Sequence, residues 1–212
     1  MLSISELSKY KVTLVSDTGT KHTFYNFSTS NNLLRQILAK HDCVELFDNE
    51  IRPIWDVQMQ NDRILKAKIE SKRTYIKEHC HNLILSGIDA DVGLVNDDGS
   101  PRGVLHYSLT ERKQEDMKDL MVMIRLGQEV VTWRDDSRVS HERYTAEQFE
   151  KLYTAASNFI FSCRFRSDAL EVLLDSYGDD TEKIDSLTWE TEIPSDIQSD
   201  MDALLSLMVS NP

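Results

Sequence analysis

Two short stretches near the start of the chain alternate apolar and polar residues. Residues 10–15 read Tyr-Lys-Val-Thr-Leu-Val, and residues 21–27 repeat the alternation as Lys-His-Thr-Phe-Tyr-Asn-Phe. The residues between them include Asp17 and Gly19, which favour a tight turn. Because neighbouring side chains in a strand point to opposite faces, this pattern predicts a β-hairpin.

After this hairpin the apolar residues change to a helical spacing. They are Leu33, Leu34, Ile37 and Leu38. Residues 28–32 supply Ser and Asn side chains that can cap the start of such a helix. Residues 51–55, with Pro53 at the centre, predict a third strand at an edge or boundary. We therefore expect residues 1–55 to form a small hairpin and helix unit that docks on other proteins.

The longest helical pattern covers residues 56–86 and stops before Gly87. Its apolar residues fall on one narrow stripe, and most of its lysines lie off that stripe. The stripe consists of Leu65, Ile69, Ile76, Cys80 and Leu83. Long helices with a narrow apolar stripe often pair with another helix, so we expect pairing with a partner or with a second copy.

Turn residues separate two further strand-like stretches, 92–95 and 104–107, and predict a second hairpin. Ser108 and Glu111 have the spacing of a capping box, in which two side chains satisfy the free backbone N–H groups at a helix start. They predict a helix beginning there. Residues 129–133 then predict a strand, followed by a polar turn.

Thr145 and Gln148 make a second capping box before the clearest amphipathic helix of the chain. Its apolar spacing extends to Leu174, and a short helical segment follows around Ile184. Taken together, the elements predict an α+β protein. It would combine the N-terminal unit with a mainly helical domain, residues 56–189, into which a hairpin is inserted.

Residues 190–212 differ in composition from the rest. A linker reaching Pro194 is followed by Ser195, which can cap a last short amphipathic helix. A helix this short is marginal by itself in water, so its apolar face must dock on its own domain or on a neighbour. The candidate interface residues near the two ends are Phe24, Phe27, Leu204, Leu205 and Met208.

Composition limits the partners of the chain. The formal net charge is −12, and an acidic surface repels both phosphate backbones and anionic lipid headgroups. We therefore expect no binding to nucleic acid or to membranes, and we find no apolar stretch long enough to cross a bilayer. The 3 cysteines are widely spaced, which favours synthesis in a reducing cytoplasm over a disulfide framework.

The sequence offers few candidates for catalytic, metal or cofactor chemistry. His79, Cys80 and His81 are metal-ligand types, but consecutive residues of a helix point about 100° apart and cannot converge on one ion. We expect Cys80 to be buried between two partly exposed histidines. The acids of residues 89–99 do not follow a calcium-loop spacing. We expect no catalytic residue, no metal site and no cofactor, and therefore a protein that is not an enzyme.

Several features follow one another in the order of a known domain. A charged helix and a hairpin come first, then Val131-Thr-Trp-Arg134, then the helix start Tyr144-Thr-Ala-Glu-Gln-Phe, and last a short helix that ends at Trp189. In this order, residues 62–189 resemble a domain of unknown function that recurs in bacteriophage tail and tail-fibre-associated proteins. The family has no established catalytic residues to carry over.

The resemblance implies a place among phage tail proteins. On this basis we expect a non-enzymatic structural component of the virion tail, made in the host cytoplasm. It would be an adaptor that joins fibres or baseplate to the tail, with other tail proteins as partners. Tails are symmetric, so we expect several copies in each particle. The alternative is a tail-fibre assembly chaperone that is absent from the mature virion.

Overall fold

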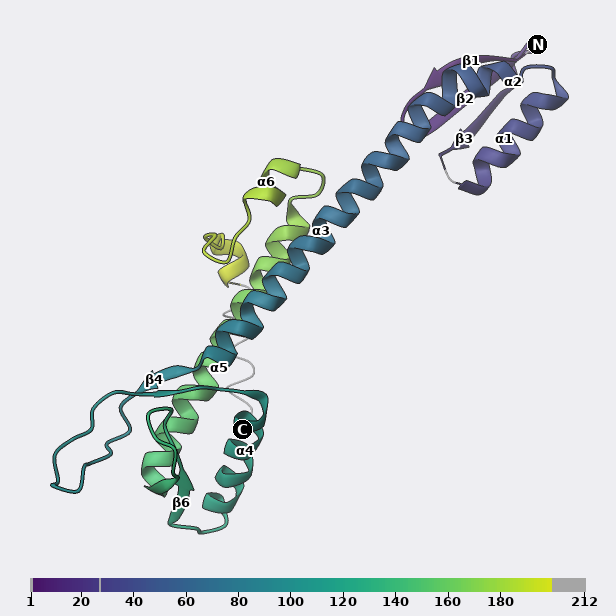
Figure 1. The fold of residues 1–212 in the computed structure, drawn as a ribbon. Helices are drawn as coiled ribbons and strands as arrows, with labels where there is room; N and C mark the ends of the chain where they lie inside the picture. Colours follow the sequence, from purple (N-terminus) through teal and green to yellow (C-terminus); the bar gives the residue numbers. More distant parts are fainter. Residues whose placement is uncertain (1, 27, 200–212) are drawn as a thin grey trace. The chain divides into compact units, whose positions relative to one another are not determined.

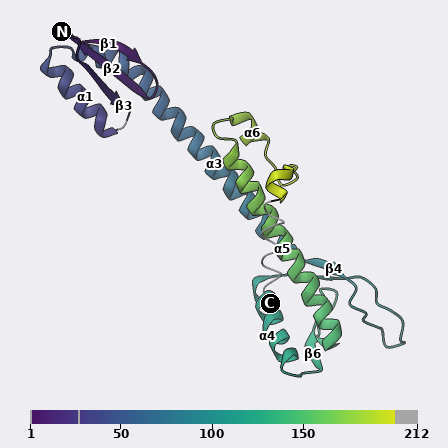
Figure 2. The same ribbon diagram turned by 180° about the vertical axis from the view of Figure 1, so that it is seen from behind.

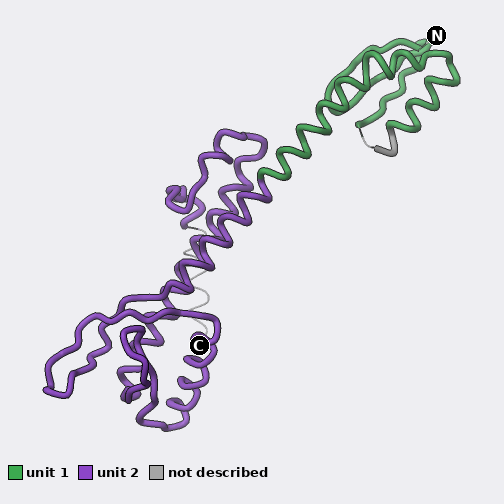
Figure 3. Tube along the Cα trace, in the orientation of Figure 1, with its two compact units in different colours: residues 1–68 green, residues 69–212 purple. Residues whose placement is uncertain are grey.

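The computed structural model describes residues 2–26 and 28–199 and has the α+β fold that the sequence predicts. Figure 1 and Figure 2 show its helices and strands from opposite sides. The chain divides into two compact units, residues 1–68 and residues 69–212 (Figure 3). Each unit has its own strands and its own buried residues.

The first unit consists of a three-stranded sheet and helices. Its elements are β1 (Leu2–Leu7), β2 (Lys11–Ser16), β3 (Lys21–Tyr25), α1 (Ser28–Lys40), α2 (Val44–Leu46), the π-helix η1 (Phe47–Ile51) and the first part of α3 (Arg52–Ser86). The sheet is antiparallel in the order β1-β2-β3, so the predicted hairpin is confirmed as β2 and β3. Strand β1 was not predicted from the sequence, and its pairing shifts register between Ile4 and Glu6. That irregularity interrupts the alternation by which a strand is recognised.

The core of the first unit lies between the sheet and its helices. Its buried residues are Leu2, Val12, Leu14, Leu34, Leu38, Phe47, Ile51 and Trp55. Trp55 closes this core, since its ring meets Phe47 edge-on with centroids 6.5 Å apart. Its indole Nε1 donates a hydrogen bond to the carbonyl oxygen of Ser8 at 3.0 Å, so the buried polar atom is satisfied.

The strand predicted for residues 51–55 is wrong, because these residues are helical. Ile51 and Trp55 are spaced by one helical turn and are both fully buried on the same face. Pro53 is the second residue of α3 and follows the π-helix directly, so the helical run from α2 through η1 continues past it. Tertiary packing of Trp55 therefore overrides the local preference that Pro53 suggested.

The second unit is mainly helical and contains two small strand pairs. Its elements after α3 are β4 (Ile88–Ala90), β5 (Leu105–Tyr107), α4 (Glu111–Arg125), β6 (Val130–Trp133), β7 (Glu142–Thr145), α5 (Ala146–Ser176) and α6 (Thr181–Ser186). Helix α5 runs beside the second part of α3 in both views (Figures 1 and 2). Lys77 of α3 and Glu171 of α5 form an ion pair between the two helices at 3.5 Å.

Helix α5 supplies the largest share of the buried residues of the second unit. The capping box predicted at Thr145 and Gln148 is confirmed, and the helix continues past Leu174 as expected. Phe149 near its start is fully buried and meets Trp133 of β6 edge-on, with ring centroids 5.6 Å apart. Further along, Cys163 and Leu170 are buried in the same helix. The predicted amphipathic face is therefore the face that forms the core.

The second hairpin is paired differently from the prediction. Strand β4 covers residues 88–90 and pairs with β5, whereas Val92 and Leu94 are buried without belonging to a strand. The apolar alternation at 92–95 therefore reflects burial and not strand pairing. Val95 and Pro101 form an isolated bridge within the long connection.

Two other local predictions are corrected in the second unit. Helix α4 is capped by Thr110, whose hydroxyl accepts from the Lys113 backbone N–H, and not by Ser108. Ser108 is engaged elsewhere, since its hydroxyl contacts Asp136. The polar turn expected after residues 129–133 leads into strand β7, which the sequence did not predict and which pairs with β6. Among the described residues, no helix has both the length and the apolar composition that crossing a bilayer requires.

Candidate functional site

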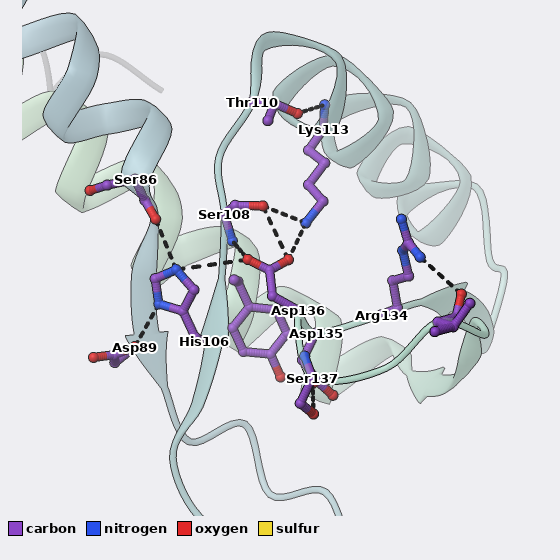
Figure 4. Close-up of polar contacts among 12 residues, drawn as sticks. Ser86, Asp89, His106, Ser108, Thr110, Lys113, Arg134, Asp135, Asp136 and Ser137 are labelled. Carbon is purple, nitrogen blue, oxygen red and sulfur yellow. Dashed lines mark hydrogen bonds and ion pairs between the residues drawn. The ribbon is translucent and has the colours of Figure 1, made fainter.

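A polar cluster gathers around His106 in the second unit (Figure 4). His106 lies in β5 opposite Asp89 of β4, and its Nδ1 is 2.7 Å from the Asp89 carboxylate. Its Nε2 is 2.8 Å from the carbonyl oxygen of Ser86 at the end of α3. Both partners are acceptors, so the doubly protonated ring satisfies both contacts. The hydrogen bond to Asp89 is accordingly the main reason why the pKa of His106 is raised.

Asp136 joins this cluster from the connection after β6. Its carboxylate accepts from the Ser108 backbone N–H at 2.8 Å and from Lys113 Nζ at 2.5 Å. Burial raises the pKa of Asp136, but the hydrogen bonds from Lys113 and Ser108 outweigh burial and lower the pKa overall. The backbone N–H of Asp136 also donates to the carbonyl oxygen of His106 at 2.9 Å. Asp136 therefore binds β5 and the start of α4 at once.

Ser108 and Lys113 are the residues in this cluster that most resemble a nucleophile and its base. Lys113 Nζ lies 2.7 Å from Ser108 Oγ, a distance suited to proton transfer. The ammonium, however, donates to both Ser108 and Asp136, so it holds no lone pair to accept the hydroxyl proton. Ser108, Lys113 and Asp136 therefore connect backbone segments through hydrogen bonds, and Ser108 is not activated as a nucleophile.

A second group of charges is buried beside this cluster. The Arg102 guanidinium contacts the carboxylates of both Asp135 and Glu142, and the Asp135 contact measures 2.6 Å. Asp135 is fully buried, and Ser137 also donates to it through its backbone N–H at 2.8 Å. Burial raises the pKa of Asp135, but the hydrogen bonds from Ser137 and Arg102 lower it overall. The three charges connect the loop before β5 to the β6–β7 pair.

A pocket of about 600 Å³ adjoins the cluster. Its lining includes Lys113, Trp133, Arg134, Asp136 and His141. The Arg134 side chain donates a hydrogen bond to the carbonyl oxygen of Val139 at 2.8 Å (Figure 4). Within the described residues, no group of three or more His, Cys, Asp or Glu side chains could hold a metal ion. The polar side chains around this pocket are mostly engaged with one another.

The residue types that the sequence singled out for chemistry lie apart from this cluster. Cys80 is buried as predicted, and burial raises the pKa of its thiol. The His79 ring stacks on Trp189, with ring centroids 4.9 Å apart. Arg166 donates hydrogen bonds to the carbonyl oxygens of Trp189 and Thr191. These residues hold the chain after α6 against α3 and α5.

The candidate interface residues near the ends have different outcomes. Phe24 is partly buried and packs against the core of its own unit. Phe27, Leu204, Leu205 and Met208 lie outside the described residues. The stripe predicted on the long helix is covered only in part by its own chain. Ile76 and Cys80 are buried in the second unit, whereas Leu65 and Ile69 are only partly buried.

A different stripe on α3 is exposed in the first unit. Ile54, Val57 and Ile64 are 40%, 58% and 56% exposed, and Asn61 between them is exposed as well. Their spacing of three, four and three residues is that of the a and d positions of a heptad repeat, the pattern of helices that pair as coiled coils. Within residues 56–68 no side chain is buried.

From Ile54 to Ala67 the charges of this helical segment lie away from the stripe. With Ile54 at an a position, the charged residues Asp56, Asp62, Arg63 and Lys66 fall at b, c and f, and Lys68 at the next a position marks the end of the apolar seam. The positions that flank a paired seam, e and g, are occupied by Gln58, Gln60, Leu65 and Ala67. An identical helix would therefore meet no like charge beside the seam. This stripe was not predicted, because the apolar residues farther along the helix form a more evident pattern. The uncharged flanking positions are the signal in the sequence that identifies it.

Comparison with known proteins gives one match. A family model described as a domain of unknown function, DUF4376, matches residues 66–191. No curated protein and no solved structure matches the chain. The matched residues contain the polar cluster, whereas the exposed stripe lies before them.

Proposed function

The chain belongs to the DUF4376 family through residues 66–191, and on that premise we propose that it is a non-enzymatic structural component of a bacteriophage tail. It acts as an adaptor that joins fibres or baseplate to the tail through protein–protein contacts. The phage setting rests on the resemblance of residues 62–189 to a domain of tail and tail-fibre-associated proteins. The adaptor role rests on the exposed heptad stripe of α3.

This stripe pairs with the same stripe on a second copy of the chain. Ile54, Val57 and Ile64 supply the apolar knobs, and their flanks carry no charge that would oppose an identical partner. Asn61 at an a position favours one register and one number of helices, because two facing Asn side chains can hydrogen-bond to each other within the apolar seam. Self-pairing brings several copies together, as a symmetric tail requires.

The polar cluster supports a structural role for the second unit. His106, Asp136 and Lys113 each bond to more than one partner, and these bonds join α3, β5, α4 and the β6–β7 connection. Arg102 joins a further loop to the same region through two carboxylates. Charges arranged in this way fix the positions of these backbone segments. An adaptor needs such a rigid surface where it contacts its partners.

Light scattering during size-exclusion chromatography tests the self-pairing. The double variant Val57→Glu/Ile64→Glu places carboxylates in the seam and should convert the assembled protein to a monomer. The control Val104→Glu/Leu126→Glu changes exposed aliphatic residues, 66% and 83% exposed, that lie off the stripe. It should assemble like the unaltered chain. A monomeric unaltered chain, or equal effects of both variants, would overturn the pairing.

Mass spectrometry of purified phage particles tests the setting. An adaptor should be present in a fixed ratio to the other tail proteins. If the chain is absent from particles but co-purifies with fibre protein from infected cells, it is instead a tail-fibre assembly chaperone. Absence from both fractions would remove the phage assignment altogether.

A further inference from the structure

An apolar groove lies between α4 and α5 of the second unit. A pocket of about 190 Å³ is lined by Met117 of α4 and by Tyr153, Ala156 and Ile160 of α5. Phe161 lies at its edge with 39% of its surface exposed. Phe161 also lines an adjoining pocket of about 320 Å³, so the two hollows meet at this ring.

The chain after α6 runs along α5 toward this groove. Lys72 near the start of the second unit donates to the carbonyl oxygens of Asp185 and Leu187, and His79 stacks on Trp189. Arg166 of α5 then holds the carbonyl oxygen of Thr191. Contacts of this segment therefore advance along α3. Helix α3 is antiparallel to α5, because Arg73 pairs with Asp175 and Lys77 pairs with Glu171. The segment is therefore antiparallel to α5 as well.

The last described residues already lie at the second hollow. Ile193 and Gln198 line the same pocket as Phe161, and residues 195–199 are helical. The apolar residues at helical spacing from there onward are Ile197, Met201, Leu204, Leu205 and Met208. If the helix continues, residues 199–208 extend for about 15 Å at 1.5 Å per residue. Tyr153 lies about 12 Å from Phe161 along α5 by the same rise, so the segment is long enough to reach it.

The groove is also positively charged, so it favours an acidic segment. Lys118 and Arg164 line it, and no described side chain forms an ion pair with either. The segment that would enter carries Asp196, Asp200 and Asp202 near its start. Opposite charges therefore meet where the apolar faces meet, and a basic segment would be disfavoured.

We propose that residues 200–208 dock in the groove between α4 and α5 of their own chain as an amphipathic helix antiparallel to α5. Met201, Leu204, Leu205 and Met208 then cover Tyr153, Ile160 and Phe161, which are partly exposed in the groove. The docked segment completes the core of the second unit. It does not serve as a free arm that binds a neighbouring protein. This contact is independent of the stripe on α3.

Disulfide trapping in the full-length protein tests the docking. Ser157 lines the groove, whereas Asn158 is exposed on another face of the same helix. Under mild oxidation, Ser157→Cys paired with Leu204→Cys or with Leu205→Cys should link within one chain. Because a disulfide needs Cα atoms within about 7 Å, at least one of these pairs should link about tenfold faster than the matching Asn158→Cys pair. Peptide mapping identifies the linked cysteines and separates them from Cys43, Cys80 and Cys163.

Charge reversal supplies a second measurement on the same variants. Lys118→Glu/Arg164→Glu should slow the linkage roughly two- to fivefold for each lost attraction, whereas Arg125→Glu, on α4 outside the groove, should leave the rate unchanged. A linkage between two chains would show that the segment fills a neighbour's groove and would overturn the proposal. Equal linkage rates at positions 157 and 158 would also overturn it, by showing that the segment does not occupy the groove. Neither result bears on the pairing of α3.

Discussion

Single charged side chains of the second unit act as ties between backbone segments that are distant in sequence. Arg102 contacts Asp135 and Glu142, which lie 33 and 40 residues farther along the chain. The Arg102 side chain is 6% exposed and that of Asp135 is fully buried, so water compensates neither charge. Removing one partner of such a pair leaves the other charge buried and unpaired, which costs far more than the pair itself contributes.

We therefore expect Arg102→Met to lower the free energy of unfolding by about 3–5 kcal/mol. The matched control is Lys151→Met, which removes the exposed ion pair with Glu147 at 2.8 Å. Exposed pairs one helical turn apart contribute only about 0.3–0.5 kcal/mol, so the control should be nearly neutral. Urea denaturation followed by circular dichroism measures both. If both variants lost similar amounts of unfolding free energy, the proposed role of Arg102 in connecting these segments would be contradicted.

At the scale of elements, the junction between α3 and β4 depends on one glycine. Gly87 ends α3 with a φ of +96°, in the left-handed region. A Cβ at this position would lie 2.1 Å from the carbonyl oxygen of Tyr107 in β5, an impossible contact with backbone. Gly87 therefore allows both the turn out of α3 and the close approach of β5, on which the position of His106 depends.

Gly87→Ala should lower the free energy of unfolding by at least about 2 kcal/mol, because backbone strain of about 1–2 kcal/mol adds to displacement of β5. Gly99→Ala provides the control, since its φ is +81° but a Cβ there meets nothing within 4 Å. It should cost only the backbone strain. Chemical denaturation compares the two, and equal costs would show that β5 is free to move away. An NMR signal of His106 that shifts only in Gly87→Ala would report that movement directly.

At the scale of the whole molecule, the two units have separate cores although α3 belongs to both. The first core ends with Trp55 and the buried residues of α3 in the second unit begin with Ile76. No residue between these two positions is buried. A helix without buried contacts transmits little packing energy, so we expect the units to unfold in separate steps.

Trp55→Ala should therefore destabilise the first unit by about 3–5 kcal/mol and leave the second unit unchanged. In a calorimetric scan, one of two transitions should move to lower temperature. Phe149→Ala, which removes a fully buried ring from the second unit, should move the other transition. A single transition that shifts with either variant would show that the cores unfold together.

Local sequence determined the elements whose chemistry is complete within a few residues. The hairpin of β2 and β3, the capped start of α5 and the buried face that contains Cys80 all follow from turn residues, caps and apolar spacing. These signals act over short distances, so they can be recognised without knowing what lies opposite. The α+β class followed from them directly.

Only the tertiary structure decided which segments meet. It paired β6 with the polar residues of β7, brought Asp135 to Arg102, and made residues 51–55 helical by burying Trp55 against the first sheet. It also showed which of two apolar stripes on α3 is covered and which is exposed. The physical reason is that burial and charge pairing depend on partners far away in the chain, and spacing along a helix does not reveal which face those partners cover.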